Sequence, residues 1–162
     1  EVGMQVSASA TAMRSLEEML AYWGSCRRPG RLPGRADIDP GGFKRLLPSV
    51  CLIDVRPGLD YRLRLAGTGL YSVYGGEITG KRLCDVYSGP AAEYWKTELD
   101  KVVTERRPQV GTQSLAWRGV SHASLLWLRM PLSSNGRDVD MILGYDGVVG
   151  IASDPMSGIR AA

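Results

Sequence analysis

Near the start of the chain, apolar residues recur every three or four positions, the spacing of one face of a helix. The members of this stripe are Met13, Leu16, Leu20 and Trp23. The pattern predicts a helix that begins near Thr11, or at Ser15 because of its capping-box spacing with Glu18, after a flexible tail over residues 1–10. Two interpretations of the stripe stay open: it packs on the sheet of its own chain, or it pairs with a second copy in a homodimer.

Residues 24–38 are rich in Gly, Pro and Arg and predict an irregular linker. Asp39 can then accept a backbone hydrogen bond at the start of a helix, and Pro40 fits its first position. A short helix is therefore expected up to Leu46-Leu47-Pro48. The first helix, the linker and this helix form a segment over residues 11–48.

Alternating apolar and polar positions predict five strands in the rest of the chain. Their ranges are Val50–Val55, Leu59–Ala66, Val110–Trp117, Ser121–Leu132 and Val139–Tyr145. Helical segments are expected over Thr68–Tyr74 and Pro90–Arg106, between the second and third strands. This order favours an α+β core over residues 49–146: a five-stranded antiparallel sheet with helices on one face, plus the N-terminal helical extension.

Glycine marks the breaks between these elements. Gly67 follows the second strand and precedes the short aromatic helix, and Gly75-Gly76 and Gly80 follow that helix. This arrangement is suited to packing a helix over the sheet and forming a pocket. Asn135-Gly136 predicts a type I′ turn between the last two strands. Residues 147–162 predict a loose C-terminal tail.

Composition is that of an ordinary folded protein, because 44% of the 162 residues are hydrophobic and 23% are charged. The net charge of +3 does not indicate nucleic-acid binding, and no run approaches the roughly 18 apolar residues of a membrane span. Three widely spaced cysteines without a CxxC motif favour a reducing compartment and predict a cytoplasmic location. The chain has a single histidine, His122, and no ligand spacing that predicts a metal site.

Several short motifs occur in a fixed order over about residues 15–146. They are Tyr22-Trp23, Leu32-Pro33, Asp37-Ile38-Asp39-Pro40, Leu46-Leu47-Pro48, Arg64-Leu65-Ala66-Gly67-Thr68, Gly75, Thr79-Gly80 and Met130-Pro131-Leu132. As a set they resemble a PAS domain, and in particular the short single-domain PAS-fold proteins of alphaproteobacteria. The resemblance implies a bacterial, cytoplasmic sensory domain in signal transduction, often dimeric, with a cavity between sheet and helices and no associated reaction.

Two cofactors of PAS relatives can be tested on the sequence. Light-oxygen-voltage photosensors carry a flavin-reactive cysteine in a Gly-Arg-Asn-Cys motif, but here Gly80 is followed by Lys81-Arg82-Leu83 and then Cys84, one position late. Such a shift turns an extended side chain to the other face, so Cys84 is expected to be a small buried apolar residue. Haem-binding relatives generally need a histidine on the long helix, and residues 90–106 contain none. Neither flavin nor haem is predicted.

A small organic ligand in the cavity would need aromatic walls and a few polar groups. The candidates are Tyr71, Tyr74, Trp95, Trp117, Trp127, Arg64 and Thr68, and Arg62 and Arg129 could add contacts to an anion. Core packing is the alternative interpretation, because a chain with one Phe must use Trp and Tyr for bulk. A basic cluster at Arg27, Arg28, Arg31 and Arg35 has two interpretations as well: a site for phosphate, a nucleotide second messenger or an acidic partner, or a solvated linker.

No catalytic constellation is visible. Ser121 and His122 are neighbours on a strand and face opposite ways, and Asp138 and Asp140 lie at a hairpin mouth. The sequence predicts a non-enzymatic sensory or regulatory protein that acts as a homodimer through contact with an unknown regulatory protein, with or without a small ligand. The alternatives are a small-ligand carrier and an enzyme of cone-shaped, ketosteroid-isomerase-like fold, a fold that usually places long helices before the sheet.

Overall fold

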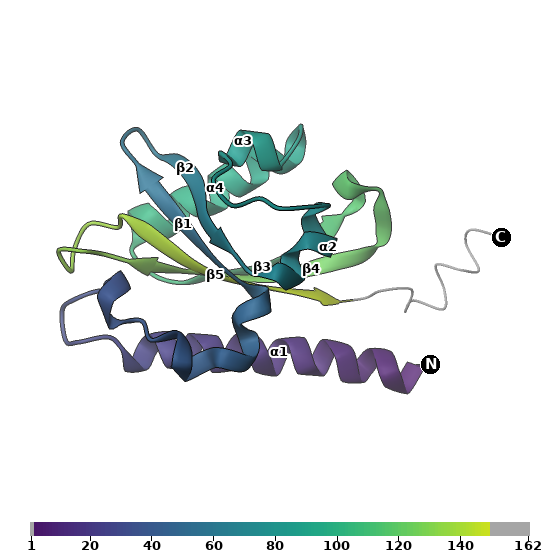
Figure 1. Cartoon of the computed structure of the whole chain (residues 1–162), viewed down its shortest axis with the longest axis horizontal. Coiled ribbons are helices and arrows are strands. Elements are labelled where there is room, and N and C mark those ends of the chain that lie inside the picture. Colours follow the sequence, from purple (N-terminus) through teal and green to yellow (C-terminus); the bar gives the residue numbers. More distant parts are fainter. Residues whose placement is uncertain (1, 150–162) are drawn as a thin grey trace.

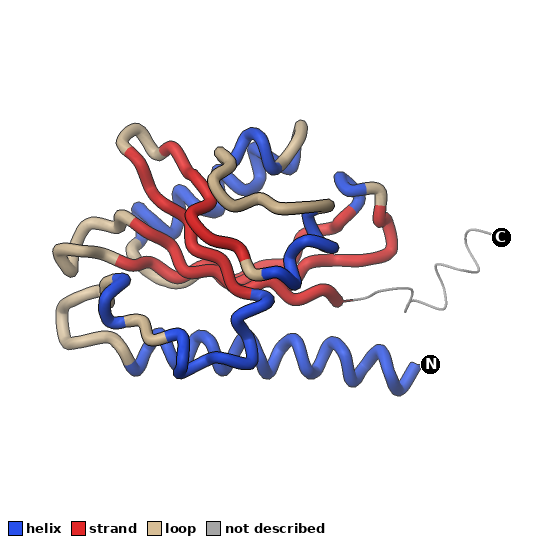
Figure 2. Tube along the Cα trace, viewed as in Figure 1, coloured by secondary structure: helices blue, strands red, loops and turns tan. Residues whose placement is uncertain are grey.

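The computed structural model describes residues 2–149, in which five antiparallel strands form one sheet with helices on both faces (Figure 1). The strands are β1 (Val50–Arg56), β2 (Asp60–Ala66), β3 (Gln109–Leu115), β4 (Val120–Leu132) and β5 (Met141–Val149). They lie in the order β2-β1-β5-β4-β3, so that the first and last described strands of the chain are neighbours at the centre. Figure 2 draws the strands in red. The predicted α+β class with a five-stranded antiparallel sheet is confirmed.

Three helices cover one face of the sheet, called here the inner face: α2 (Tyr71–Tyr74), α3 (Leu83–Val86) and α4 (Pro90–Glu105). The longest, α4, begins with proline in its first turn and ends where Arg106 adopts a left-handed conformation. Its apolar stripe places Trp95, Leu99 and Val102 against the sheet, and all three are fully buried. The helix predicted from this stripe is therefore present with the expected face inward.

The opposite, outer face of the sheet is covered by α1 (Val2–Ser25) and by the 3-10 helical segment η2 (Pro40–Ser49). This face needs a cover because Leu128, Met130 and Leu143 project from it and are buried. Burying each such side chain contributes about 1.5–3 kcal/mol. A sheet that is apolar on both faces must bury both, which gives α1 its position.

The stripe of α1 packs on its own sheet. Leu16 and Trp23 are buried, and the Trp23 indole nitrogen donates a hydrogen bond of 2.9 Å to the backbone oxygen of Pro131 in β4. Leu20 is partly buried, and Met13 is 45% exposed. This packing favours the first interpretation of the stripe, and the dimer interface at Met13, Leu16, Leu20 and Trp23 stays a prediction.

Most element ends lie within about two residues of the predicted ones, and two lie further away. The helix begins at Val2 rather than at Thr11 or Ser15, so residues 2–10 are helical and not a tail. Strand β5 continues to Val149, beyond the predicted end at Tyr145, and the rest of the predicted C-terminal tail lies outside the described residues. Within residues 2–149, no helix is long and apolar enough to cross a membrane.

The turn between β4 and β5 is not the type I′ turn predicted from Asn135-Gly136. A type I′ turn needs positive φ at both central residues, and of these two only Gly136 has it, at 83°. The Asn135 side-chain oxygen instead accepts hydrogen bonds from the backbone amides of Arg137 and Asp138, at 2.9 and 2.8 Å. Asparagine thus organises a longer loop through its side chain, a role that its dipeptide with glycine does not reveal.

Candidate functional site

A buried ion pair lies at the centre of the inner face. Arg129 of β4 and Asp146 of β5 project from the same face, since Arg129 pairs with Gly144 and Trp127 pairs with Asp146 across the two strands. The guanidinium meets the carboxylate at two points, with Nη1 at 2.7 Å from Oδ1 and Nη2 at 3.3 Å from Oδ2. Their side chains are 2% and 0% exposed, so the charges rely on each other rather than on water.

Gly144 makes the space in which the Arg129 side chain lies. A β-carbon at this position would fall 2.5 Å from the Cys51 sulfur and 2.9 Å from Arg129 Nη1. Without that β-carbon, Nη1 can also donate to the backbone oxygen of Tyr145 at 3.2 Å. The glycine in β5 is therefore a packing requirement of the arginine opposite it.

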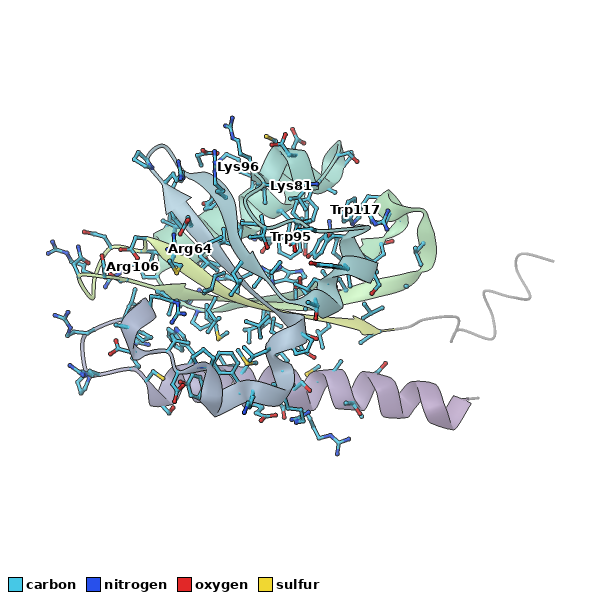
Figure 3. All side chains as sticks on the ribbon, in the orientation of Figure 1. Arg64, Lys81, Trp95, Lys96, Arg106 and Trp117 are labelled. Carbon is cyan, nitrogen blue, oxygen red and sulfur yellow. The ribbon has the colours of Figure 1, made fainter. Side chains whose placement is uncertain are left out.

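Two tyrosines extend the hydrogen-bond network of the carboxylate, Tyr74 directly and Tyr87 through Tyr74. The Tyr74 hydroxyl of α2 donates to Asp146 Oδ2 at 2.7 Å, and the Tyr87 hydroxyl donates to that of Tyr74 at 3.1 Å. The Trp95 ring of α4 covers the guanidinium, 4.6 Å from its centroid to the guanidinium carbon. Figure 3 shows Trp95 directed into the layer between sheet and helices. The charged pair is thus enclosed by groups from both layers of the domain.

Burial controls the ionisation of this cluster. Burial alone would lower the pKa of Arg129, but Asp146, with contributions from Cys51 and Tyr74, outweighs burial, so the pKa is raised and the guanidinium stays charged. The pKa of Tyr74 is raised by burial and further by Asp146, which keeps its hydroxyl a donor. Burial also raises the pKa of the Cys51 thiol to about 11, with Arg129 opposing the shift.

Little space remains among these side chains. The cavity that they line, together with residues such as Ile53 and Leu99, offers about 10 Å³ to a water-sized sphere. That is room for about one water molecule, whereas sites for organic ligands measure roughly 300–1,000 Å³. One polar atom of the cluster, Arg129 Nε, is buried without a hydrogen-bond partner among residues 2–149. In this arrangement the centre of the domain is closed.

The predicted ligand-binding residues separate into two groups. Tyr74 and Trp95 line this small cavity, and the rings of Trp117 and Trp127 flank it, with Trp127 centred 5.0 Å from Trp95. The other three lie elsewhere, namely Tyr71, Arg64 and Thr68, which are exposed. The Tyr71 hydroxyl bonds to Glu77, and Arg64 on β2 faces Asp54 at 3.6 Å (Figure 3).

Sequence reasoning missed the residues that define the cluster. The sequence predicts Arg129 as a contact to an anionic ligand or as a strand arginine that extends into water, and it predicts no site role for Asp146, Tyr87 or Cys51. A signal was present, because Arg129 interrupts an apolar run in a strand of a two-sided sheet, and such a charge needs a buried partner. The sequence offers several acids, however, and only the register of β4 and β5 selects Asp146.

A five-stranded antiparallel sheet with this strand order and helices on its inner face defines an α+β domain. A family model described as PAS domain matches residues 11–146, and the chain belongs to the PAS domain family. No curated protein matches the chain in sequence.

Solved structures show the same fold at low sequence identity. The PAS domain of BvgS from Bordetella pertussis aligns with a TM-score of 0.51 and 19% identity, covering 76% of this chain and 94% of that one. A light-oxygen-voltage domain studied with a flavin analogue gives a TM-score of 0.52 and 15% identity, covering 76% and 96%.

The residues of this chain do not fit a flavin as arranged here. The central cavity of about 10 Å³ is far too small, and Cys84 does not line it. Cys84 is exposed on α3 and lines a surface groove beside Lys96, so its predicted burial is wrong. The His122 side chain lies outside the described residues. Among the described ones, no three His, Cys, Asp or Glu side chains gather as a metal site would require.

Proposed function

We propose that this protein is a non-enzymatic sensory or regulatory PAS domain whose output is contact with another protein. The observation that carries the proposal is the bidentate Arg129–Asp146 pair at the centre of the inner face. It fills the layer between sheet and helices with the protein's own charges, where a ligand-loaded relative would need open space. The family supports the sensory role, since PAS domains serve sensing and signalling.

The chemistry of the central cluster supports a non-enzymatic role. The Cys51 thiol is fully buried with a pKa of about 11, so the nucleophilic thiolate is scarce near neutral pH. The tyrosines are held protonated by burial and act as hydrogen-bond donors. No group there combines a nucleophile with a base and with access for a substrate.

The two alternatives are weaker. A carrier of small ligands would need a cavity of hundreds of Å³ in this layer, against the 10 Å³ present. A cone-shaped enzyme fold is disfavoured because the family match over residues 11–146 is to PAS domains. The absence of flavin and haem is part of the proposal and rests on the same lack of space.

Native mass spectrometry of the intact chain, purified under mild conditions from bacterial cells, tests the proposal. The expected result is the mass of the bare polypeptide, together with a protein partner recovered by crosslinking in the source cells. A stoichiometric organic molecule retained at the mass of one per chain would contradict the closed centre and favour the carrier. A bare chain for which crosslinking recovers no protein would contradict the signalling output.

The homodimer stays a prediction, as do the cytoplasmic location and the membership of an alphaproteobacterial group. With Leu16 and Trp23 turned toward the sheet, Met13 is the member of the stripe most available to a second copy. Light scattering of the wild type and of Met13→Glu measures this directly. A dimer that becomes monomeric in the variant supports pairing through α1, and a monomeric wild type contradicts it.

A further inference from the structure

A surface groove of about 610 Å³ lies where the linker after α1 crosses the loop between β4 and β5. Its lining includes Arg28, Arg31 and Arg35, three of the four arginines in the basic cluster of the linker. Buried Leu32 and Pro33 lie between them in the chain and also line the groove. The volume is within the range of small-molecule sites, unlike that of the closed centre of the domain.

The linker is held in place by backbone pairing rather than loosely solvated. The Leu32 amide donates to the Gly136 oxygen at 2.8 Å, and the Ser133 amide donates to the Pro33 oxygen at 2.9 Å. Gly34 lets the two segments approach, because a β-carbon there would fall 2.8 Å from the Ser133 oxygen. The linker backbone that carries these arginines is therefore fixed. A fixed backbone lowers the entropy cost when the arginines bind a ligand.

The guanidinium groups in this groove have N–H donors that could bind a ligand. Within residues 2–149, Arg28, Arg31 and Arg35 form no ion pair, whereas other arginines of the chain do. Arg31 and Arg35 each donate to one backbone oxygen, that of Asn135 and that of Ile38, at 3.2 Å in both cases. A guanidinium offers five N–H donors, so most remain free.

The charge balance of the groove favours an anion. Arg28 and Arg31 are opposed in a tight antiparallel bridge, which places their side chains on the same side of the linker. Asp37 is the one acidic residue in the lining, and its Oδ2 accepts the Gly34 amide at 2.8 Å, which partly satisfies its charge. Three guanidinium groups thus face one carboxylate.

We propose that this groove binds a small molecule that carries two or more phosphate groups, of the size of a nucleoside diphosphate. Planar guanidinium groups match phosphate oxygens in pairs, and several of them suit several phosphates. A groove of about 610 Å³ has room for a molecule of this size. The inference stands apart from the proposed signalling output, because it concerns a different surface and needs no protein partner.

Isothermal titration calorimetry of the full chain with ADP and with inorganic pyrophosphate tests the site, at low and at physiological salt. The variants are Arg28→Gln, Arg31→Gln and Arg35→Gln. The matched control is Arg14→Gln, which removes the same charge from an exposed position of α1 outside the groove. We expect each groove variant to weaken binding at least about tenfold, equivalent to about 1.4 kcal/mol, and the control to bind as the wild type does.

The affinity of the wild type should also fall as salt is added. Three results would overturn the proposal: no heat of binding with either probe at millimolar concentration, equal losses in the groove variants and in Arg14→Gln, or tighter binding of a hexaglutamate peptide than of pyrophosphate through the same arginines. Circular dichroism of each variant confirms that the fold is intact. If Arg31→Gln does not fold, the exposed Arg28 and Arg35 variants decide the outcome.

Discussion

The inner face and the linker groove use arginine in opposite ways. Arg129 is buried, bonded at two points to Asp146 and stacked on Trp95. Its charge is therefore neutralised by a partner inside the fold and is not available to a ligand. Arg31 is exposed, fixed by its backbone, and bonded to one carbonyl oxygen. The same side chain is thus a structural element where a charged partner and burial surround it, and a candidate ligand contact where neither does. Four predictions follow this contrast, from the largest expected effect to the smallest.

Breaking the central ion pair should destabilise the protein most. Asp146→Leu leaves the Arg129 guanidinium buried without its counter-charge, and we expect a loss of about 3–5 kcal/mol in the free energy of unfolding. Urea denaturation followed by tryptophan fluorescence measures it. Glu18→Gln, which breaks the exposed pair with Arg45, is the control and should cost less than about 1 kcal/mol. Equal effects of the two variants would contradict the contrast.

Alkaline pH should weaken the inner cluster through Cys51. Its folded pKa of about 11 is raised above the unfolded value, so the neutral thiol is favoured by folding. The contribution of the neutral Cys51 thiol to the free energy of unfolding is fully present below about pH 9. It declines by about 3 kcal/mol as the pH rises from about 9 to about 11. The free energy of unfolding of Cys51→Ala should fall less steeply over this range than that of the wild type. The exposed Cys84→Ala should keep the wild-type slope, and identical slopes in all three proteins would contradict the assignment.

Gly144→Ala tests how tightly Arg129 is packed. The new β-carbon would meet the Cys51 sulfur and the guanidinium, and overpacking of this kind costs about 1–3 kcal/mol. Gly24→Ala is the matched control, because nothing lies within 4 Å of the added atom and helical alanine is favourable. The midpoint of urea denaturation should drop for the first variant and stay level or rise for the second. An unchanged urea midpoint for Gly144→Ala would contradict the tight packing of Arg129 against this glycine.

Removing a groove arginine should change stability least. Arg31→Gln deletes an exposed side chain without an ion-pair partner in the described part of the chain, and we expect a change within about 0.5 kcal/mol. Thermal unfolding without added ligand measures it. A loss comparable to that of Asp146→Leu would show that the groove arginines are structural, and it would remove the distinction between the two regions.

Most of the fold could be predicted from the sequence because its signals are local. Asp39 accepts the Gly41 amide at 2.9 Å at the start of η2, as its type and its place before Pro40 predict. The spacing of apolar residues such as Trp95 likewise gave the buried face of α4. The start of α1 could not be found in this way, because the apolar residues Val2, Met4 and Val6 recur at every second position rather than at helical spacing.

The site was less accessible to sequence reasoning because its contacts are not local. Tyr74 and Trp95 could be named as aromatic residues of the cavity, but the closure of that cavity depends on a pairing between Arg129 and Asp146 that only strand register determines. For the same reason, the sequence did not decide whether the α1 stripe packs on its own sheet or on a second copy, since both contacts are non-local. Helical spacing shows that a face is apolar and does not show what covers it.

A double-mutant cycle on Arg129 and Asp146 tests most directly whether the centre of the domain is held by its own charges. The proteins compared are the wild type, Arg129→Met, Asp146→Leu and the double variant, each unfolded in urea at neutral pH. We predict that each single change is strongly destabilising and that the double variant regains much of the loss, with an interaction energy of about 2 kcal/mol or more. Additive losses, with an interaction energy near zero, would contradict the account.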